Sequence, residues 1–194
     1  MTSIVLEGTV IKEPAYSHET YGIRYYETYV ASTRKSEVVD CLRVIFPEIL
    51  APHFSCLQLV RVGGEVRTRN EDGHLRVFVL AFSMLEPTGT DTNEVTIDGY
   101  VCKKPIYRQT PLGRHITDLC IASGRRTSHM SDYIPSLCWG NVAVAMSEVE
   151  VGTHLYLFGR LQSRTYNKKT EEGEKQMVAY EVSISSLREV LEDE

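Results

Sequence analysis

The chain contains an internal duplication. The segment I-V-L-E-G-T-V at residues 4–10 is echoed by V-T-I-D-G-Y-V at residues 95–101, so Gly99 follows Gly8 at an offset of 91 (99 − 8 = 91). Gly113 follows Gly22 at the same offset (113 − 22 = 91). A later motif, G-E-V-R-T-R from residue 64, recurs as G-R-L-Q-S-R from residue 159, with the offset grown to 95 (159 − 64 = 95). Each copy must therefore fold on its own pattern, within about half of the chain.

Length and composition agree with two small domains. A chain of 194 residues with 42% apolar content can bury a core in each copy. No apolar run approaches the roughly 18 to 20 residues that a membrane helix requires, and the N-terminus lacks the basic and then apolar order of a secretory signal. We therefore expect a cytoplasmic protein with no membrane partner. The five cysteines are odd in number and contain no C-x-x-C pair, so they predict neither a disulfide framework nor a metal site.

Alternating and β-branched runs predict five strands in each copy. In the first copy the runs are residues 4–11, 25–32, 38–46, 59–67 and 77–82, and in the second copy they are residues 95–102, 116–122, 133–139, 153–161 and 177–184. Between the third and fourth strands, the second copy favours one short helix capped near Asn141. At the same point the first copy has Pro47, which suits a first helical position, and Pro52, which should cut that helix short. Five strands with a helix after the third describe an OB-fold, so the predicted fold is all-β with two tandem OB-fold barrels.

A polar, turn-rich stretch at residues 86–93 marks the linker between the copies. We therefore place a first OB-fold domain at residues 1–87 and a second at residues 93–188. Residues 189–194 form a short acidic C-terminus.

One strand of the second copy has an aromatic and polar face. Leu155 and Leu157 alternate there with Tyr156, Phe158 and Arg160. Two interpretations are open: the aromatic rings cover the barrel or an oligomer interface, or the face stacks bases and neutralises phosphates. The net charge of −5 has the wrong sign for a generic polyanion binder, so the positions of the cations decide.

Motifs of the second copy follow a known order. P-x-x-R-x-x-P-x-G at residues 105–113 precedes Trp139-Gly140, and Y-x-x-G-x-L-x-x-R follows at residues 156–164. With these motifs, residues 94–187 resemble the bacterial single-stranded DNA-binding protein (SSB) family. Tyr133 stands where that family has an aromatic, and Tyr166 takes the place of an aromatic in the loop that clamps single strands.

The resemblance implies binding of single-stranded DNA with little sequence specificity, in DNA replication, recombination or repair. Such a binder needs aromatic platforms interleaved with cations, because single strands expose flat bases and a flexible polyanion. The candidate platforms are Tyr133, Trp139, Tyr156 and Tyr166. The candidate phosphate partners are Arg108, Arg114, Arg125, Arg126, Arg160, Arg164, Lys168 and Lys169. Each also has a structural interpretation: Trp139 fits a core or an interface, and the two lysines fit a solvated loop tip.

The first copy matches the family less well. The counterpart of Tyr166 in this copy is Glu71 (166 − 95 = 71), so an acid replaces a platform. Phe46 is offered as the counterpart of Trp139, and Cys41 would then replace Tyr133. We expect the first copy to be a weak binder or an architectural partner.

Other functions have less support from the sequence. The chain has no G-x-S-x-G elbow, P-loop or H-E-x-x-H motif, so we expect neither an enzyme nor a bound cofactor or metal. The alternative is an OB-fold protein-interaction or assembly module with weak nucleic-acid binding, as in the PriB-like relatives of the SSB family.

The resemblance also carries expectations about assembly. Family members work with four OB barrels, which implies a homodimer of this chain. Typical cellular members carry a long tail with an acidic and hydrophobic tip that recruits other enzymes. No such tail follows residue 188 here, so we expect the protein to coat DNA without recruiting much.

Overall fold

The computed structural model describes residues 1–170 and 173–188. The first copy forms β1 (Thr2–Val10), β2 (Ala15–Thr20), β3 (Ile23–Thr33), β4 (Val39–Pro47), the 3-10 helix η1 (Glu48–His53), β5 (Leu59–Glu71) and β6 (His74–Leu85). The second copy forms β7 (Asn93–Val101), β8 (Ile106–Gln109), β9 (His115–Gly124), β10 (Ser131–Trp139), α1 (Gly140–Met146), β11 (His154–Thr170) and β12 (Gly173–Arg188). The acidic C-terminus at residues 189–194 lies outside the described residues. Neither described helix has the length and apolar character to cross a membrane.

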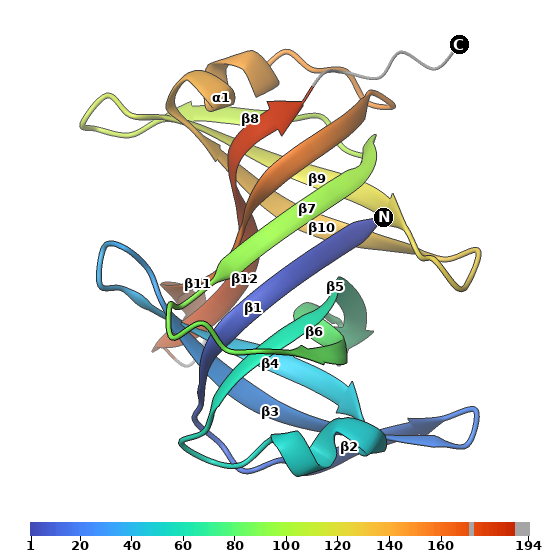
Figure 1. Ribbon diagram of the computed structural model, residues 1–194. Helices are drawn as coiled ribbons and strands as arrows, with labels where there is room; N and C mark the ends of the chain where they lie inside the picture. Colours follow the sequence, from blue (N-terminus) through green and yellow to red (C-terminus); the bar gives the residue numbers. More distant parts are fainter. Residues whose placement is uncertain (171–172, 189–194) are drawn as a thin grey trace.

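The strands close into two barrels that share one continuous sheet (Figure 1). In the first barrel, β1 pairs with both β5 and β3, and the order β3-β4-β6-β5-β1 completes the ring. In the second barrel, β7 pairs with both β11 and β9, and β9-β10-β12-β11-β7 completes an equivalent ring. The pairs β4–β6 and β10–β12 are parallel. The predicted all-β fold of two tandem OB-fold barrels is confirmed.

Each copy has one strand more than the sequence predicts. β2 and β8 pair with β3 and β9 as hairpin arms outside the closed rings (Figure 1). All four residues of β8 are exposed, and β2 buries none of its residues fully. Because these strands have no inward apolar face, they lack the alternating pattern by which the other strands were predicted.

The two short helices also differ in detail from the prediction. α1 begins directly after Trp139, which has no side-chain capping bond, so the cap does not lie at Asn141. Gly140 makes the turn from strand to helix at a φ of 59°, a left-handed conformation that glycine adopts at little cost. In the first copy Pro47 is the N-cap and Pro52 lies inside η1. A proline there has no N–H to donate, so the segment forms a short 3-10 helix instead of an α-helix.

Two repeated glycines mark a bulge in each barrel. The pairing register shifts next to Gly64 in β5 and next to Gly159 in β11. A Cβ on Gly64 would lie 2.3 Å from the carbonyl oxygen of Leu80, and one on Gly159 would lie 2.2 Å from that of Ser183. Only glycine fits such a close approach of two strands. The repeated G-x-x-x-x-R motif thus has a structural origin.

A pair of neighbouring strands joins the two barrels. β1 and β7 run antiparallel, with Ile4 opposite Val95, and lie side by side at the centre of the molecule (Figure 1). The cores of both barrels are continuous across this pair, because Ile4 and Val95 are both 2% exposed. Burial of aliphatic surface on both sides stabilises the junction.

Two equivalent carboxylates add to the contact between the barrels. Asp40 of the first barrel accepts hydrogen bonds from the backbone N–H (2.7 Å) and the hydroxyl (3.2 Å) of Ser163. Asp132 of the second barrel accepts the same two bonds from Thr68, at 2.7 Å and 3.3 Å. Both carboxylates are almost fully buried. Since each barrel offers the other the same contact, the interface has approximate twofold symmetry.

The linker is held against the first barrel by Glu7. Its buried carboxylate accepts hydrogen bonds from the backbone N–H (2.9 Å) and the hydroxyl (2.8 Å) of Thr88, and from the N–H of Gly89 (2.6 Å). Burial raises the pKa of Glu7, but these donors and the charge of Arg61 lower it, and the net pKa is lowered. The carboxylate thus replaces water as the partner of linker groups.

Candidate nucleic-acid interface

Side chains of β10 alternate between the inside and the outside of the second barrel. Ile134 and Cys138 point into the core and are fully buried. Tyr133 and Trp139 lie on the outer face and expose 50% and 41% of their surface. They are six residues apart on one face, so at about 3.3 Å per residue about 20 Å of strand separates them. Trp139 is therefore an accessible ring on the barrel surface and not a core residue.

The neighbouring strands place a cation beside Trp139. Ile116 of β9 lies directly opposite Trp139 of β10, and Arg108 of β8 lies opposite Ile116. Because adjacent strands are about 4.8 Å apart, the backbone of Arg108 lies about 10 Å from that of Trp139. The Nε of Arg108 donates to Asp118 at 3.0 Å, and both side chains of this ion pair are exposed. An exposed pair of this kind contributes little to stability and can exchange its partner.

The outer face of β11 carries a second aromatic and cationic group. The guanidinium carbon of Arg164 lies 5.6 Å from the ring centroid of Tyr166, a cation-π distance. The Nε of Arg164 also donates to Glu181 at 3.4 Å. Tyr166 exposes 37% of its surface. These two residues thus form a unit with an accessible ring and a cation beside it.

The start of β11 carries an aromatic cluster. Tyr156 contacts Phe158 edge to face, with ring centroids 5.2 Å apart. The guanidinium carbon of Arg188 in β12 lies 5.5 Å from the centroid of Phe158. Phe158 and Arg188 are absent from the residues predicted for binding. The pairing of Tyr156 with Arg188 follows only from the register of β11 and β12, although the alternation along β11 indicates that Phe158 shares the face of Tyr156.

Two of the predicted arginines lie in contacts between the barrels. Arg125 donates to both oxygens of Asp132, from Nε at 2.9 Å and from Nη2 at 2.8 Å. Its Nη2 also donates to the carbonyl oxygen of Thr68 at 3.1 Å. Arg160 lies near the equivalent contact: burial lowers its pKa, the positive charge of Arg34 lowers it further, and Asp40 opposes both. The guanidinium of Arg125 is therefore occupied by the partner barrel.

The remaining predicted cations lie on loops or at the end of β11. Arg114 is exposed in the turn between β8 and β9, where its N–H donates to the hydroxyl of Thr110 at 3.0 Å. Arg126 is largely exposed in the turn between β9 and β10, with its Nε 3.9 Å from a carboxylate oxygen of Glu65. Lys168 and Lys169 belong to β11 by their backbone, but their side chains lie outside the described residues.

The same surface of the first barrel has a different chemistry. Pro47 ends β4 just before η1, as Trp139 ends β10 just before α1, and so occupies the position of the tryptophan. Phe46, offered by the sequence as that counterpart, is instead buried in the core and stacks on Phe54 with centroids 3.9 Å apart. Cys41 is exposed at the position of Tyr133. The first barrel therefore lacks both aromatic platforms of this strand.

Carboxylates also neutralise the cations of this first surface. Arg43 donates to Glu27 from Nε at 3.1 Å and to both oxygens of Glu71 from Nη1 at 3.1 Å. Arg69 donates from its Nε to the same Glu71 at 3.0 Å. The two guanidinium groups lower the pKa of Glu71 against the opposing effect of its burial. The acid that replaces Tyr166 in the first copy thus occupies two cations.

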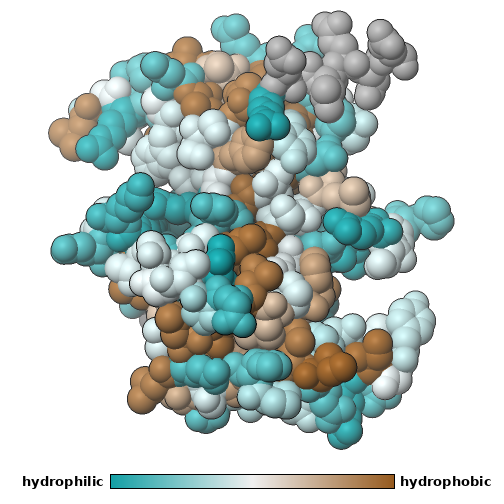
Figure 2. All heavy atoms as spheres, in the orientation of Figure 1, coloured by the Kyte–Doolittle hydropathy of each residue, from teal (hydrophilic) through white to brown (hydrophobic). Residues whose placement is uncertain are grey.

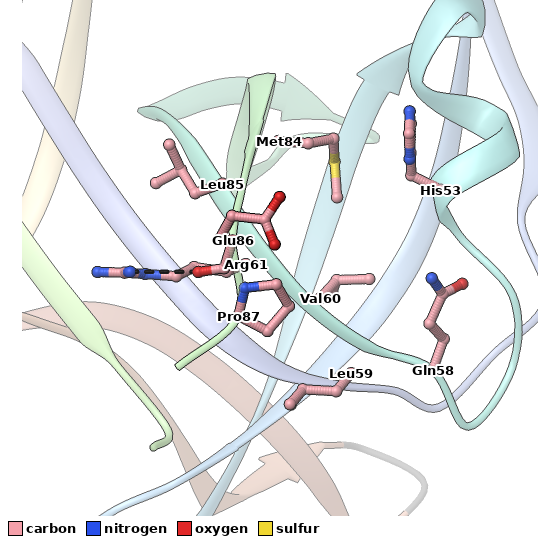
Figure 3. Close-up of a pocket in the computed structure, with 9 residues that line it drawn as sticks. All are labelled: His53, Gln58, Leu59, Val60, Arg61, Met84, Leu85, Glu86 and Pro87. Carbon is pink, nitrogen blue, oxygen red and sulfur yellow. Dashed lines mark hydrogen bonds between the residues drawn. The ribbon is translucent and has the colours of Figure 1, made fainter. Parts of the chain in front are cut away.

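The first barrel also contains a pocket of about 240 Å³, next to the linker (Figure 3). His53 of η1 and Met84 of β6 line it, and Arg61 donates from Nη1 to the carbonyl oxygen of Glu86 at 3.3 Å. On the face shown in Figure 2, much of the hydrophobic surface lies over this barrel. No predicted binding residue lines the pocket. In the described part of the chain, no cluster of three or more potential metal ligands is present.

Comparisons with known proteins agree with this geometry. The sequence model of the single-strand binding protein family matches residues 92–189, which is 98 of 194 residues (189 − 92 + 1 = 98). The structure is similar to the wild-type single-stranded DNA binding protein from Thermus aquaticus, with 22% identity, a TM-score of 0.77, and coverage of 100% of this chain and 95% of that chain. A deletion mutant of that protein gives 24% identity, a TM-score of 0.77, and coverage of 100% and 96%. No curated protein sequence matches significantly. With just over half of its length matched, the chain belongs to the single-strand binding protein family.

Proposed function

We propose that this protein binds single-stranded DNA with little sequence preference, chiefly through its second barrel, and acts in DNA replication, recombination or repair. The observation that carries the proposal is the outer face of β10, where Tyr133 and Trp139 are exposed on one line with Arg108 two strands away. Flat rings in line stack bases of any sequence, at about 1 to 3 kcal/mol per base. Membership of the family supports the same role.

The β11 unit supplies a further contact. Tyr166 offers a ring for one base, and Arg164 at 5.6 Å offers a cation for the adjoining phosphate. Arg114 and Arg126 lie exposed on the loops of the same barrel and serve as further phosphate partners. Arg125 is assigned a different role, because Asp132 and Thr68 occupy its donors.

The two copies divide the work unequally. Residues 1–87 and 93–188 act as two structural units, and the first contributes little binding. Glu71 and Glu27 neutralise Arg43, and Pro47 replaces the tryptophan platform. The first barrel therefore serves mainly to position the second barrel through the β1–β7 pair.

The assembly follows from the family resemblance. Two chains of two barrels supply the four OB barrels with which family members work. Sedimentation equilibrium should give twice the mass of one chain, and a mass of one chain at micromolar concentration would refute the dimer.

A second function remains in competition for the first barrel. Its ion-paired outer face and the net charge of −5 favour a protein-interaction or assembly module, with weak nucleic-acid binding. Substitution of Trp139 and Tyr166 by alanine separates the two functions. It should abolish DNA binding under the main proposal and leave the binding of a protein partner intact under the alternative.

The direct test uses the single tryptophan as a probe. An oligothymidylate is titrated into the protein at low and moderate salt, and the emission of Trp139 is followed. We expect strong quenching that salt reverses, with log K falling by roughly 0.7 per phosphate neutralised. Unchanged emission together with no shift of a labelled oligonucleotide on a gel would reject the proposal.

A further inference from the structure

Two cysteines of the second barrel lie opposite each other across adjacent strands. The β7–β9 register pairs Tyr100 with Ala122 and Val101 with Ile121, so the next pair along is Cys102 and Cys120. The backbone N–H of Cys102 donates to the carbonyl oxygen of Cys120 at 3.0 Å. Opposite residues in such a hydrogen-bonded antiparallel pair have Cα atoms about 5.5 Å apart. That separation lies within the range of about 4.4 to 6.8 Å found for disulfides.

The two side chains are also in contact. The Sγ of Cys102 lies 3.1 Å from the carbonyl oxygen of Cys120. Burial raises the pKa of Cys120 to about 11, and a hydrogen bond with the Cys102 side chain contributes to this shift. Both residues are partly exposed, so a small oxidant can reach them, whereas Cys138 is buried in the core. The pair thus combines proximity with access.

The location gives a covalent link a structural effect. The ring of the second barrel closes between β7 and β9 through only two paired residues, whereas β9 and β10 pair along nine. The thiols lie at the end of this short seam, 18 residues apart in the chain. A bond between them would close that loop permanently and restrict the unfolded chain.

We propose that Cys102 and Cys120 form a reversible disulfide that clips the seam of the second barrel under oxidising conditions. This proposal is independent of the DNA-binding function. The oxidant is a peroxide, with hydrogen peroxide as the simplest case. Since Cys120 is held as the thiol at neutral pH, Cys102 is the thiol that reacts first.

The reaction proceeds in two balanced steps. The thiolate of Cys102 attacks one peroxide oxygen, the O–O bond breaks, and hydroxide leaves and takes up the proton that the thiol released. The product is a sulfenic acid on Cys102. The sulfur of Cys120 then attacks the sulfur of Cys102, the S–O bond breaks, and the oxygen leaves as water with the proton of Cys120. One peroxide is thus reduced to two waters while two thiols are oxidised to one disulfide, and a dithiol reductant reverses the change.

The test treats the full chain with hydrogen peroxide and then maps its peptides without reduction. We expect a peptide that joins the two cysteines, a mass lower by about 2 Da for the two hydrogens lost, and a rise in Tm of about 5 to 10 °C that dithiothreitol reverses. The variant Cys120→Ser should retain sulfenic acid on Cys102, detected by a dimedone adduct, and show no rise in Tm.

Two further measurements guard the interpretation. The matched control Cys56→Ser changes an exposed cysteine of the first barrel and should form the same joined peptide and show the same rise in Tm as the unchanged protein. The peptide map of the unchanged protein needs no variant, so a folding defect of Cys120→Ser would not obscure the result. Cross-links through Cys41 or Cys56 with both seam cysteines still free to alkylate would overturn the proposal.

Discussion

Truncation of Tyr133 to alanine tests the aromatic face of β10 most directly. Tyr133 exposes 50% of its surface. A tyrosine can bury about 200 Å², so about 100 Å² remains for a ligand, and one base stacked on a single face covers about half of it. Burial of about 50 Å² at about 25 cal/mol per Å² gives about 1.3 kcal/mol. This value lies within the range of about 1 to 3 kcal/mol for a stacked base, and it predicts binding about ninefold weaker.

The assay is fluorescence anisotropy of a labelled oligothymidylate at one fixed salt concentration. The matched control is Tyr21→Ala, which removes a fully exposed tyrosine from the tip of the β2–β3 hairpin in the first barrel and should leave the Kd unchanged. Tyr133 is half exposed, so its truncation should leave the urea midpoint close to that of the unchanged protein. A Kd within twofold of that of Tyr21→Ala, in a folded variant, would refute the stacking argument.

Three further predictions follow from the contacts described. Asp132→Asn leaves Arg125 without its charged partner in a buried site, so urea unfolding should show a loss of about 3 to 5 kcal/mol. The pKa of Asp132 is lowered in the folded protein, because its burial is outweighed by the hydrogen bond and charge of Arg125. Its stabilisation is therefore present above the unfolded pKa of about 3.9 and is lost as the pH falls through the folded pKa, and the asparagine variant should lack this acid-dependent part. Glu71→Gln frees Arg43 for phosphate, so DNA affinity should rise and the slope of log K against log salt should steepen by about 0.7, whereas an unchanged slope would exclude the first barrel from the DNA path. Gly159→Ala places a Cβ against a carbonyl oxygen at 2.2 Å, so thermal melting should show a Tm several degrees lower, and an unchanged Tm would contradict the described bulge.

Several features of the fold were predictable from local sequence. The repeat, the ring strands and the position of the helix after the third strand follow from periodicity and turn chemistry, which act between near neighbours in the chain. β2 and β8 were missed because their side chains face solvent on both sides, so their strand pairing is not encoded in a hydrophobic pattern. The helix of the first copy was placed correctly, but Pro52 inside it changes its type.

The candidate site was predictable in part. The rings of Tyr133 and Trp139 lie on the outside of their strand, as alternation from a buried residue such as Ile134 requires. The role of Arg125 could not be read in the same way. Its partner Asp132 is near in sequence, but the contact of both residues with Thr68 depends on how the two barrels meet.

The sequence by itself determined that the chain is a duplicated β-barrel protein with aromatic and cationic residues concentrated in the second copy. Only the tertiary structure decided which cations are available. A guanidinium on a surface strand is free for phosphate or occupied by a carboxylate according to what lies across from it, and those partners are up to 65 residues away for Arg67 and Asp132. Strand periodicity reports which face a side chain occupies. The charge that faces it depends on strand order, register and the packing of one barrel on the other.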